Sequence, residues 1–210
     1  MKTVWEIVDR FEELVAEYAG SKYAVAVDSC SNALFLSLKL CQYFNISTIG
    51  STIQIPSRTY ISVPMQVIHS GHSVEFNNDP WEGTYQLGSL PVIDSAQRFT
   101  EGMYTNDTLY CLSFHSKKIL SIGRGGMVLT NNSEHYEWLK RSRYDGREKI
   151  YYNDISNQTV PTLGWHMYMT PEEATRGIEQ LYKTPKVNLD SGRSGDYAID
   201  LSTLSCLKTV

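Results

Sequence analysis

The spacing of apolar residues predicts an amphipathic helix near the start of the chain. Between residues 4 and 18 the apolar side chains recur every three or four positions and fall on one helical face: Val4, Ile7, Val8, Phe11, Leu14, Val15 and Tyr18. Gly20 follows, and glycine readily adopts the left-handed conformation that ends many helices. We therefore expect a helix over residues 4–18 that buries one face.

Short apolar segments alternate with helical patterns along most of the remaining chain. YAVAV (23–27) is typical of a buried strand, and the polar segment DSCSN separates it from the helical pattern of residues 33–44. Further strands are predicted at 51–56, 73–76, 90–94, 108–114 and 126–130, and further helices at 60–69, 133–143 and 171–183. This alternation indicates an α/β protein, so we predict a mainly parallel sheet sandwiched by helices.

The domain organisation follows from length and periodicity. A chain of 210 residues with 41% hydrophobic residues can bury a sizeable core. From residue 185 onward the sequence is rich in Gly, Ser and charge, with little periodicity. We expect one domain over residues 1–184 and an irregular extension over residues 185–210.

Composition narrows the class of protein further. The net charge of −4 gives no basic surface for nucleic acid. The apolar runs are too short for a membrane span, and acidic residues stand where a signal peptide would be apolar, so we expect a cytoplasmic protein with no membrane partner. The cysteines are widely spaced and the histidines lack metal-ligand spacing, which favours reduced core thiols and no metal site: Cys30, Cys41, Cys111 and Cys206.

Candidate functional residues are those that directly follow the predicted strands, because open α/β sheets bind ligands at the carboxyl ends of their strands. These positions are 28–32, 57–60, 94–97 and 113–118. The first group lies at a helix start, where Ser and Asn are ordinary caps, and where free N–H groups and hydroxyls also suit a phosphate. Elsewhere in the chain, the glycine-rich segment GRGG (123–126) could suggest a nucleotide phosphate loop. That interpretation is disfavoured because no Gly-Lys-Ser/Thr follows.

The other groups also allow two explanations each. Asp94 either caps the next turn or faces a cationic ligand atom. Tyr60 either packs in the core or supports a flat ring. Lys118 either faces solvent or is an amine nucleophile, its pKa lowered by burial and by the neighbouring Lys117. Together, a phosphate site, an aromatic plate, a buried acid and a lysine match the requirements of pyridoxal phosphate.

Several motifs resemble one family, the DegT/DnrJ/EryC1/StrS sugar aminotransferases, which are fold type I pyridoxal phosphate enzymes. VIDSAQRF is similar to their D-[AS]-A-Q element, and CLSFHSKKILSIGRGGMVLTNN to their S-F-H-x-x-K segment followed by G-x-G-G-M-[VI]-x-T. FEELVAEYAGSKYAVAVDSCSNALFLSLKL resembles the opening helix, strand and phosphate turn, and IPSRTYISVPMQVIHSGHSVEF the next helical unit. The resemblance spans about residues 8–183 and implies a large domain like that of aspartate aminotransferase.

The resemblance implies catalytic and ring-binding roles for four positions. Lys118 would be the catalytic lysine that forms a Schiff base with the cofactor aldehyde, and Lys117 would have no such role. Asp94 would pair with the pyridine nitrogen and so support catalysis. Gln97 would hydrogen-bond near the ring hydroxyl, and Tyr60 would stack on the ring.

The resemblance also implies a phosphate site and a shared dimer. Ser31, the backbone of Asn32 and Ser113 would hold the cofactor phosphate. His166 stands in GWHMYM at the position of the asparagine of the family's G-x-N-x-R-M element, which reaches the phosphate of the partner subunit, and Tyr168 replaces its arginine. A homodimer is therefore expected.

The chain also departs from the family pattern. The segment between Asp79 and Pro91 is short, so we expect the sheet to have lost an element or to be rewired. The leading glycine-bearing segment and most of the small carboxyl-terminal domain have no counterpart. The implied function is transfer of an amino group from an amino acid such as glutamate to a keto sugar nucleotide. The alternative is an inactive cofactor-binding remnant that serves as a binding or regulatory subunit.

Overall fold

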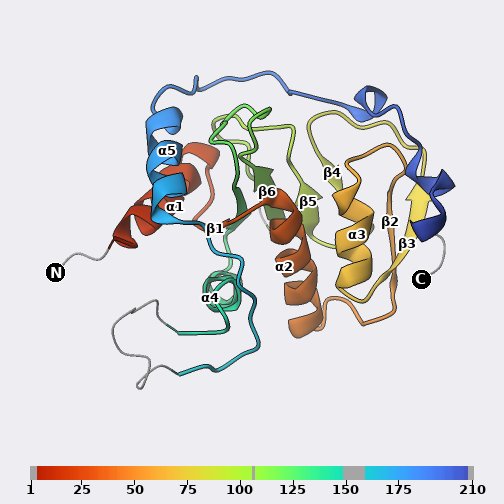
Figure 1. Cartoon of the computed structure of the whole chain (residues 1–210), viewed down its shortest axis with the longest axis horizontal. Helices are drawn as coiled ribbons and strands as arrows, with labels where there is room; N and C mark the ends of the chain where they lie inside the picture. Colours follow the sequence, from red (N-terminus) through yellow and green to blue (C-terminus); the bar gives the residue numbers. More distant parts are fainter. Residues whose placement is uncertain (1–3, 106, 149–158, 208–210) are drawn as a thin grey trace.

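The protein, seen in a computed structural model that describes residues 4–105, 107–148 and 159–207, contains one five-stranded sheet and one two-stranded sheet (Figure 1). The order of the large sheet is β1 (Tyr23–Val27), β7 (Gly126–Thr130), β6 (Leu109–Ser113), β5 (Val92–Asp94) and β4 (Tyr85–Gln86). The small sheet pairs β2 (Thr52–Pro56) with β3 (Ser73–Asn77) in parallel. The α/β class is confirmed.

The prediction of a mainly parallel sheet was wrong. In the five-stranded sheet β7 runs antiparallel to both β1 and β6, and β4 runs antiparallel to β5. In the same sheet, β5 and β6 run parallel to each other. Parallel neighbours need a long crossover, commonly a helix, whereas residues 114–125 join β6 to β7 without one, and the chain therefore returns antiparallel.

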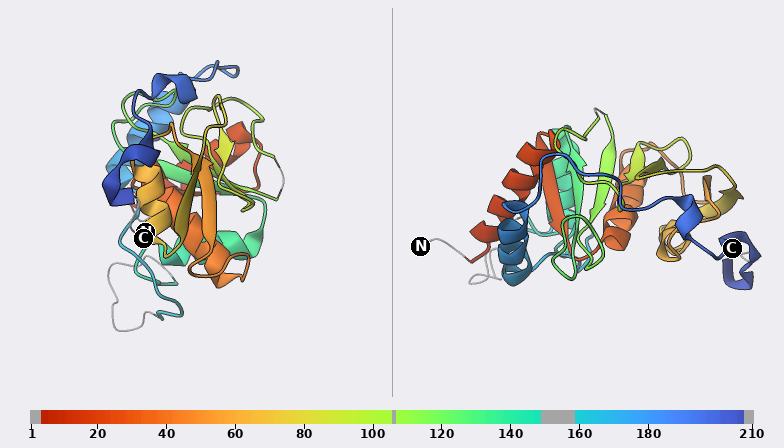
Figure 2. Two further views of the ribbon diagram at one scale, coloured as in Figure 1. Left: turned by 90° about the vertical axis from the view of Figure 1, so that its right-hand side faces the viewer. Right: turned by 90° about the horizontal axis from the view of Figure 1, so that it is seen from above.

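Helices cover both faces of the large sheet, as predicted (Figure 2). On one face lie α1 (Glu6–Ala19) and α5 (Pro171–Leu181), which pack with Ala24 and Ala26 of β1. On the other face lie α2 (Cys30–Tyr43) and α4 (Ser133–Ser142), packed with Val25 and Val27. α3 (Ser62–His69) joins this second core beside the small sheet. Alternate residues of β1 therefore enter two separate cores.

The first and last α-helices form for reasons visible in the sequence. α1 ends at Gly20, which has φ 82° and whose N–H donates to Ala16 O, so the predicted helix and its stop are confirmed. α5 begins with a capping box in which Thr170 and Glu173 each bond the other's backbone N–H. The two helices meet where Gly177 lies against the ring of Phe11.

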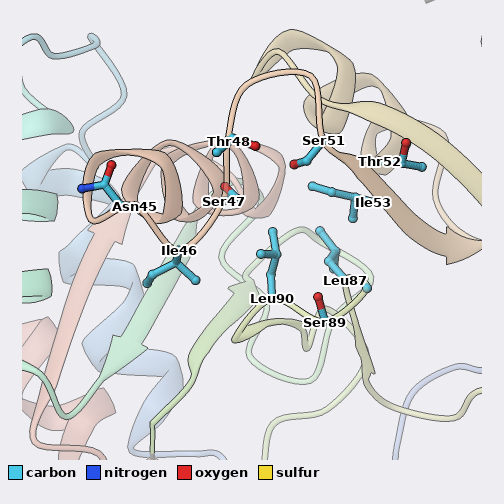
Figure 3. Close-up of a pocket in the computed structure, with 11 residues that line it drawn as sticks. Asn45, Ile46, Ser47, Thr48, Ser51, Thr52, Ile53, Leu87, Ser89 and Leu90 are labelled. Carbon is cyan, nitrogen blue, oxygen red and sulfur yellow. The ribbon is translucent and has the colours of Figure 1, made fainter.

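The short segment before β5 lies between the two sheets and is hydrogen-bonded to both, in line with the expected rewiring. β4 has two residues, and the N–H of Gly88 donates to Gln54 O of β2 at 2.8 Å. Between the sheets lies a cavity of about 260 Å³ where the side chains of Ile53, Leu87 and Leu90 converge (Figure 3). Its lining has hydroxyls but no acidic, basic or thiol side chain, so it offers no group for acid–base chemistry.

After α5 the chain continues as a long irregular segment. Three short 3₁₀ helices lie in it, at Ser194–Asp196, Leu201–Thr203 and Ser205–Leu207. Cys206 is exposed, so the prediction that it is a core thiol was wrong, whereas Cys41 and Cys111 are buried free thiols. None of the helices among the described residues has the length and apolar character needed to cross a bilayer.

Candidate active site

The strand ends meet at a cavity of about 730 Å³. Side chains from the ends of β5 and β6, the first turns of α2 and α3, and the segment after α5 line it. Six of the eight predicted site residues lie in its wall: Ser31, Tyr60, Asp94, Gln97, Ser113 and Lys118. Asn32 and His166 do not. The rule that ligands gather at strand ends therefore locates the cavity.

Lys118 lies in a turn after β6, where its N–H donates to His115 O at 2.9 Å. Burial lowers the pKa of its ammonium group, and the nearby carboxylate of Asp94 partly offsets that effect. Lys117 is exposed and is not a cause of the shift, so that part of the prediction was wrong. With the described residues the Lys118 amine forms no hydrogen bond or salt bridge, which leaves it available to a ligand.

Asp94 is 5% exposed at the end of β5, and both of its oxygens have protein donors. The hydroxyl of Tyr85 donates to Oδ2 at 2.7 Å, and the N–H of Ala96 donates to Oδ1 at 2.9 Å. Burial raises the pKa of Asp94, while these two hydrogen bonds and the positive charge of Lys118 act in the opposite direction. Asp94 therefore caps the following turn, as the first explanation predicted, and it also lines the cavity. That it faces a cationic ligand atom stays a prediction.

Tyr85 and Thr59 support Asp94 through hydrogen bonds. Tyr85 was not predicted as a site residue, and Thr59 lies in the candidate group 57–60 but was given no role. The Tyr85 hydroxyl lies 2.5 Å from Thr59 Oγ1. Because Tyr85 uses its single proton for Asp94, Thr59 donates to Tyr85. Burial, followed by the charge of Asp94, raises the pKa of Tyr85 well above its usual value. Tyr85 therefore stays neutral and remains a donor.

The start of α2 combines a helix cap with a pair of serine hydroxyls at the cavity. Ser29 Oγ accepts the N–H of Asn32 at 3.2 Å, and the Asn32 amide donates to Asp28. Ser29 is therefore an ordinary helix cap, as one of the two explanations predicted. The N–H of Asn32 donates to this cap and not into the cavity. Ser31 Oγ lies 2.6 Å from Ser62 Oγ, and both line the cavity with Ser113.

The glycine-rich segment before β7 brings that strand against the start of α2. A side chain at Gly126 would place its Cβ 2.3 Å from the carbonyl carbon of Ser29, so this contact requires glycine. Arg124, at the cavity rim, donates to Oδ2 of Asp28 at 2.7 Å and to its backbone oxygen at 3.2 Å. The segment therefore fixes the first turn of α2 by packing and charge.

Two predicted residues lie on the surface. Tyr60 is 59% exposed and lines the cavity, which excludes core packing. His166 lies outside the wall of its own chain's cavity, where Nδ1 pairs with Asp145 at 3.2 Å beside the rings of Tyr144 and Tyr168. Its predicted role toward a partner subunit stays a prediction.

The segment after α5 supplies cavity residues that the sequence did not indicate. Ser191, Asp196 and Tyr197 line the cavity. Gln97 donates from Nε2 to the Tyr197 hydroxyl at 3.0 Å and accepts from Ser191 Oγ at 2.8 Å. No periodicity or motif marks these three residues.

Comparison with known proteins places this site in a family. The sequence model of the DegT/DnrJ/EryC1/StrS aminotransferase family matches residues 2–87 and 101–193, which include most of the cavity wall. The chain belongs to this family. The resemblance inferred from the motifs is therefore confirmed.

Two relatives found by sequence have names that refer to sugar metabolism. The spore coat polysaccharide biosynthesis protein SpsC of Bacillus subtilis is 26% identical over 83% of this chain and 56% of its own length. The GDP-perosamine synthase of Caulobacter vibrioides is 24% identical over 86% of this chain and 59% of its own. The chain thus spans somewhat more than half the length of these family members.

Solved structures show the same fold. The Helicobacter pylori aminotransferase PseC, involved in the biosynthesis of pseudoaminic acid, has a TM-score of 0.68 and 18% identity, covering 87% of this chain and 62% of its own. A mutant of GDP-4-keto-6-deoxymannose-3-dehydratase (ColD) with bound GDP-perosamine has a TM-score of 0.70 and 19% identity, covering 86% of this chain and 61% of its own. Since the second is named as a dehydratase, the fold alone does not fix the reaction.

Proposed function

We propose that the protein is a pyridoxal phosphate-dependent aminotransferase that moves an amino group from an amino acid such as glutamate to a keto sugar nucleotide. The observation that carries this proposal is that Lys118 and Asp94 face one cavity, the first with a lowered pKa and the second with a raised one. A pair of cavity residues whose pKa values are perturbed in this way is a candidate site of chemistry. Family membership and the names of the two sequence relatives support the substrate class.

The residues present suit the groups that the cofactor offers. Pyridoxal phosphate carries an aldehyde, a pyridine nitrogen, a ring hydroxyl and a phosphate, and when bound it supplies a ring that accepts the electrons of a carbanion. The Lys118 amine suits the aldehyde, and the buried carboxylate of Asp94 suits a protonated ring nitrogen. Three of the serine hydroxyls in the cavity wall, those of Ser31, Ser62 and Ser113, suit the phosphate.

Lys118, Asp94 and Tyr60 would then each have a different role in the reaction. Because burial lowers its pKa, more of Lys118 is neutral amine than in water, which favours covalent attachment and later lets Nζ take and return a proton at the substrate Cα. The hydrogen bonds from Tyr85 and Ala96 favour the ionised form of Asp94 against the effect of burial. Tyr60 at the cavity mouth offers a ring face for stacking.

Assembly and organisation belong to the same proposal. We infer a cytoplasmic homodimer in which His166 reaches the cavity of the partner subunit. Residues 1–184 would be a reduced cofactor-binding domain, and residues 185–210 an extension. Support comes from the resemblance at GWHMYM and from the position of His166 away from its own cavity.

The test is a glutamate titration of protein loaded with pyridoxal phosphate. We expect the absorbance of the bound cofactor to change and one equivalent of 2-oxoglutarate to be released per site, with no change in Lys118→Ala. If neither glutamate, other amino donors nor amino sugar nucleotides alter the spectrum, the protein is the alternative, a cofactor-binding subunit without transaminase activity.

A further inference from the structure

The segment after α5 crosses the molecule over the cavity. From α5 it passes above the edge of the large sheet and ends beside the small sheet (Figures 1 and 2). Backbone hydrogen bonds hold it along its length: Glu101 N–H donates to Lys186 O, Ser191 N–H to Gln97 O, Gly83 N–H to Gly192 O, Ser194 N–H to Trp81 O and Leu201 N–H to Ser57 O. We call residues 186–201 the strap.

Charged side chains fix the strap near the cavity. Arg98 donates two hydrogen bonds to the Asp190 carboxylate, from Nε at 2.8 Å and from Nη2 at 2.5 Å. Arg58 Nη1 donates to the backbone oxygens of Tyr197 at 2.9 Å and Ala198 at 3.2 Å. Arg58 follows β2 and Arg98 follows β5, so the strap is held from both sheets. A paired, two-point contact to a carboxylate is the stronger kind of ion pair.

The strap also sets the orientation of Gln97. Its amide is bonded at both ends, by the Tyr197 hydroxyl and by Ser191 Oγ, and these two bonds hold the amide group in place. Gly192 permits the contact, because a Cβ there would lie 2.8 Å from Gln97 Cδ. Tyr197 is in turn packed beside Trp81, with ring centres 5.7 Å apart.

The strap is a wall of the cavity and does not fill it. With the strap in place the cavity still holds about 730 Å³, within the roughly 300–1,000 Å³ typical of small-molecule sites. A segment that filled the cavity would have left little volume in it. The contacts to Gln97 therefore leave room for a ligand.

We propose that the strap forms one side of the ligand site, that Tyr197 and Ser191 are positioning residues for Gln97, and that strap closure and ligand binding stabilise each other. The identity of the ligand rests on the function proposed above. The coupling follows from thermodynamic reciprocity, since a ligand that contacts a wall present only in the closed state must favour that state.

Amide hydrogen exchange of the full chain, with and without pyridoxal phosphate, tests the strap directly. We expect the N–H groups of Ser191 and Leu201 to be protected without cofactor and about threefold to tenfold more protected at saturation. In Tyr197→Phe, and separately in Ser191→Ala, we expect faster exchange at the N–H of position 191 and about threefold to tenfold weaker cofactor binding, the effect of one hydrogen bond. Tyr182→Phe, a substitution on an exposed ring, should change neither.

The outcomes separate the strap from the proposed function. Unprotected strap amides in the wild type, or Tyr197→Phe and Ser191→Ala that both bind and exchange like the wild type, would overturn the strap proposal. Protected amides that loosen in Tyr197→Phe, in a protein that binds no pyridoxal phosphate, would support the strap as a cavity wall and reject the proposed cofactor.

Discussion

Among single residues, Asp94 has the most constrained environment in the cavity. A carboxylate 5% exposed is costly unless it is hydrogen-bonded, and here Tyr85 and Ala96 each occupy one oxygen. Thr59 in turn donates to Tyr85. The three side chains form a chain of hydrogen bonds that ends at the cavity and fixes the position of the Asp94 carboxyl group.

Tyr85→Phe tests this arrangement without cofactor. The folded-state pKa of Asp94 is raised above its unfolded value, so its contribution to stability is present at low pH and is lost as pH rises through the folded pKa. Removing the hydroxyl raises that pKa further. We expect the destabilisation to grow with pH, reaching about 1.5–3 kcal/mol once Asp94 ionises.

Urea unfolding between about pH 4 and pH 8 measures this effect. The matched control is Tyr43→Phe, which removes a hydroxyl from an exposed ring. A loss of stability in Tyr85→Phe that is the same at every pH would contradict the proposed link to Asp94.

The cysteines should differ sharply in reactivity, because the thiolate is the reactive form. Burial raises the pKa of Cys41 to about 12, and raises those of Cys30 and Cys111 as well. Cys206 is exposed. At pH 8 we expect iodoacetamide to modify Cys206 rapidly and the other three only after unfolding, as peptide mass spectrometry can show. Rapid labelling of Cys41 in the folded protein would contradict the structure.

Sequence reasoning located the residues that follow strands but not their partners. Asp94, Gln97 and Lys118 were predicted because each lies at or just after the end of an apolar strand. Tyr197 lies 100 residues from Gln97 in the chain, in a segment with no periodicity. Its contact depends on the path of the strap, which local patterns do not encode.

Among the elements, α1 and α5 depend on one close approach. A Cβ on Gly177 would lie 2.4 Å from Cζ of Phe11, whose ring is fully buried and cannot move aside. Helix propensity alone predicts that Gly177→Ala stabilises α5 by about 1 kcal/mol. The packing predicts the opposite sign.

We therefore expect Gly177→Ala to destabilise the protein by about 1–3 kcal/mol in thermal or urea unfolding. Gly195→Ala is the control, since a Cβ there meets no atom within 4 Å. A Gly177→Ala protein as stable as the wild type would show that the helices do not pack as described.

The sequence patterns missed the direction of the strands and the two-residue strand β4. The other strands and the α-helices were predicted close to their observed bounds because periodicity reports burial along one segment. Pairing joins segments far apart, as when β7 inserts between β1 and β6. The absence of a helix between residues 114 and 125 was the signal that could have revealed the antiparallel return.

For the whole molecule, assembly decides whether His166 has a role. In a homodimer, sedimentation should give twice the 23.9 kDa chain mass, and His166→Ala should weaken cofactor binding severalfold. In a monomer that histidine has no access to a cavity it does not line. A dimer whose His166→Ala variant binds pyridoxal phosphate like the wild type would reject the role across the interface.

The lysine to which the cofactor attaches tests the proposed active site directly. Lys118 is half-buried and has no hydrogen bond or salt bridge from its side chain to the described residues. Borohydride reduction of protein loaded with pyridoxal phosphate, followed by peptide mass spectrometry, should find one phosphopyridoxyl group per chain on Lys118. Lys117→Ala should label like the wild type, and Lys118→Ala should not label. Modification of Lys117, or an unchanged cofactor absorbance in Lys118→Ala, would contradict the proposal that Lys118 is the reactive lysine of this site.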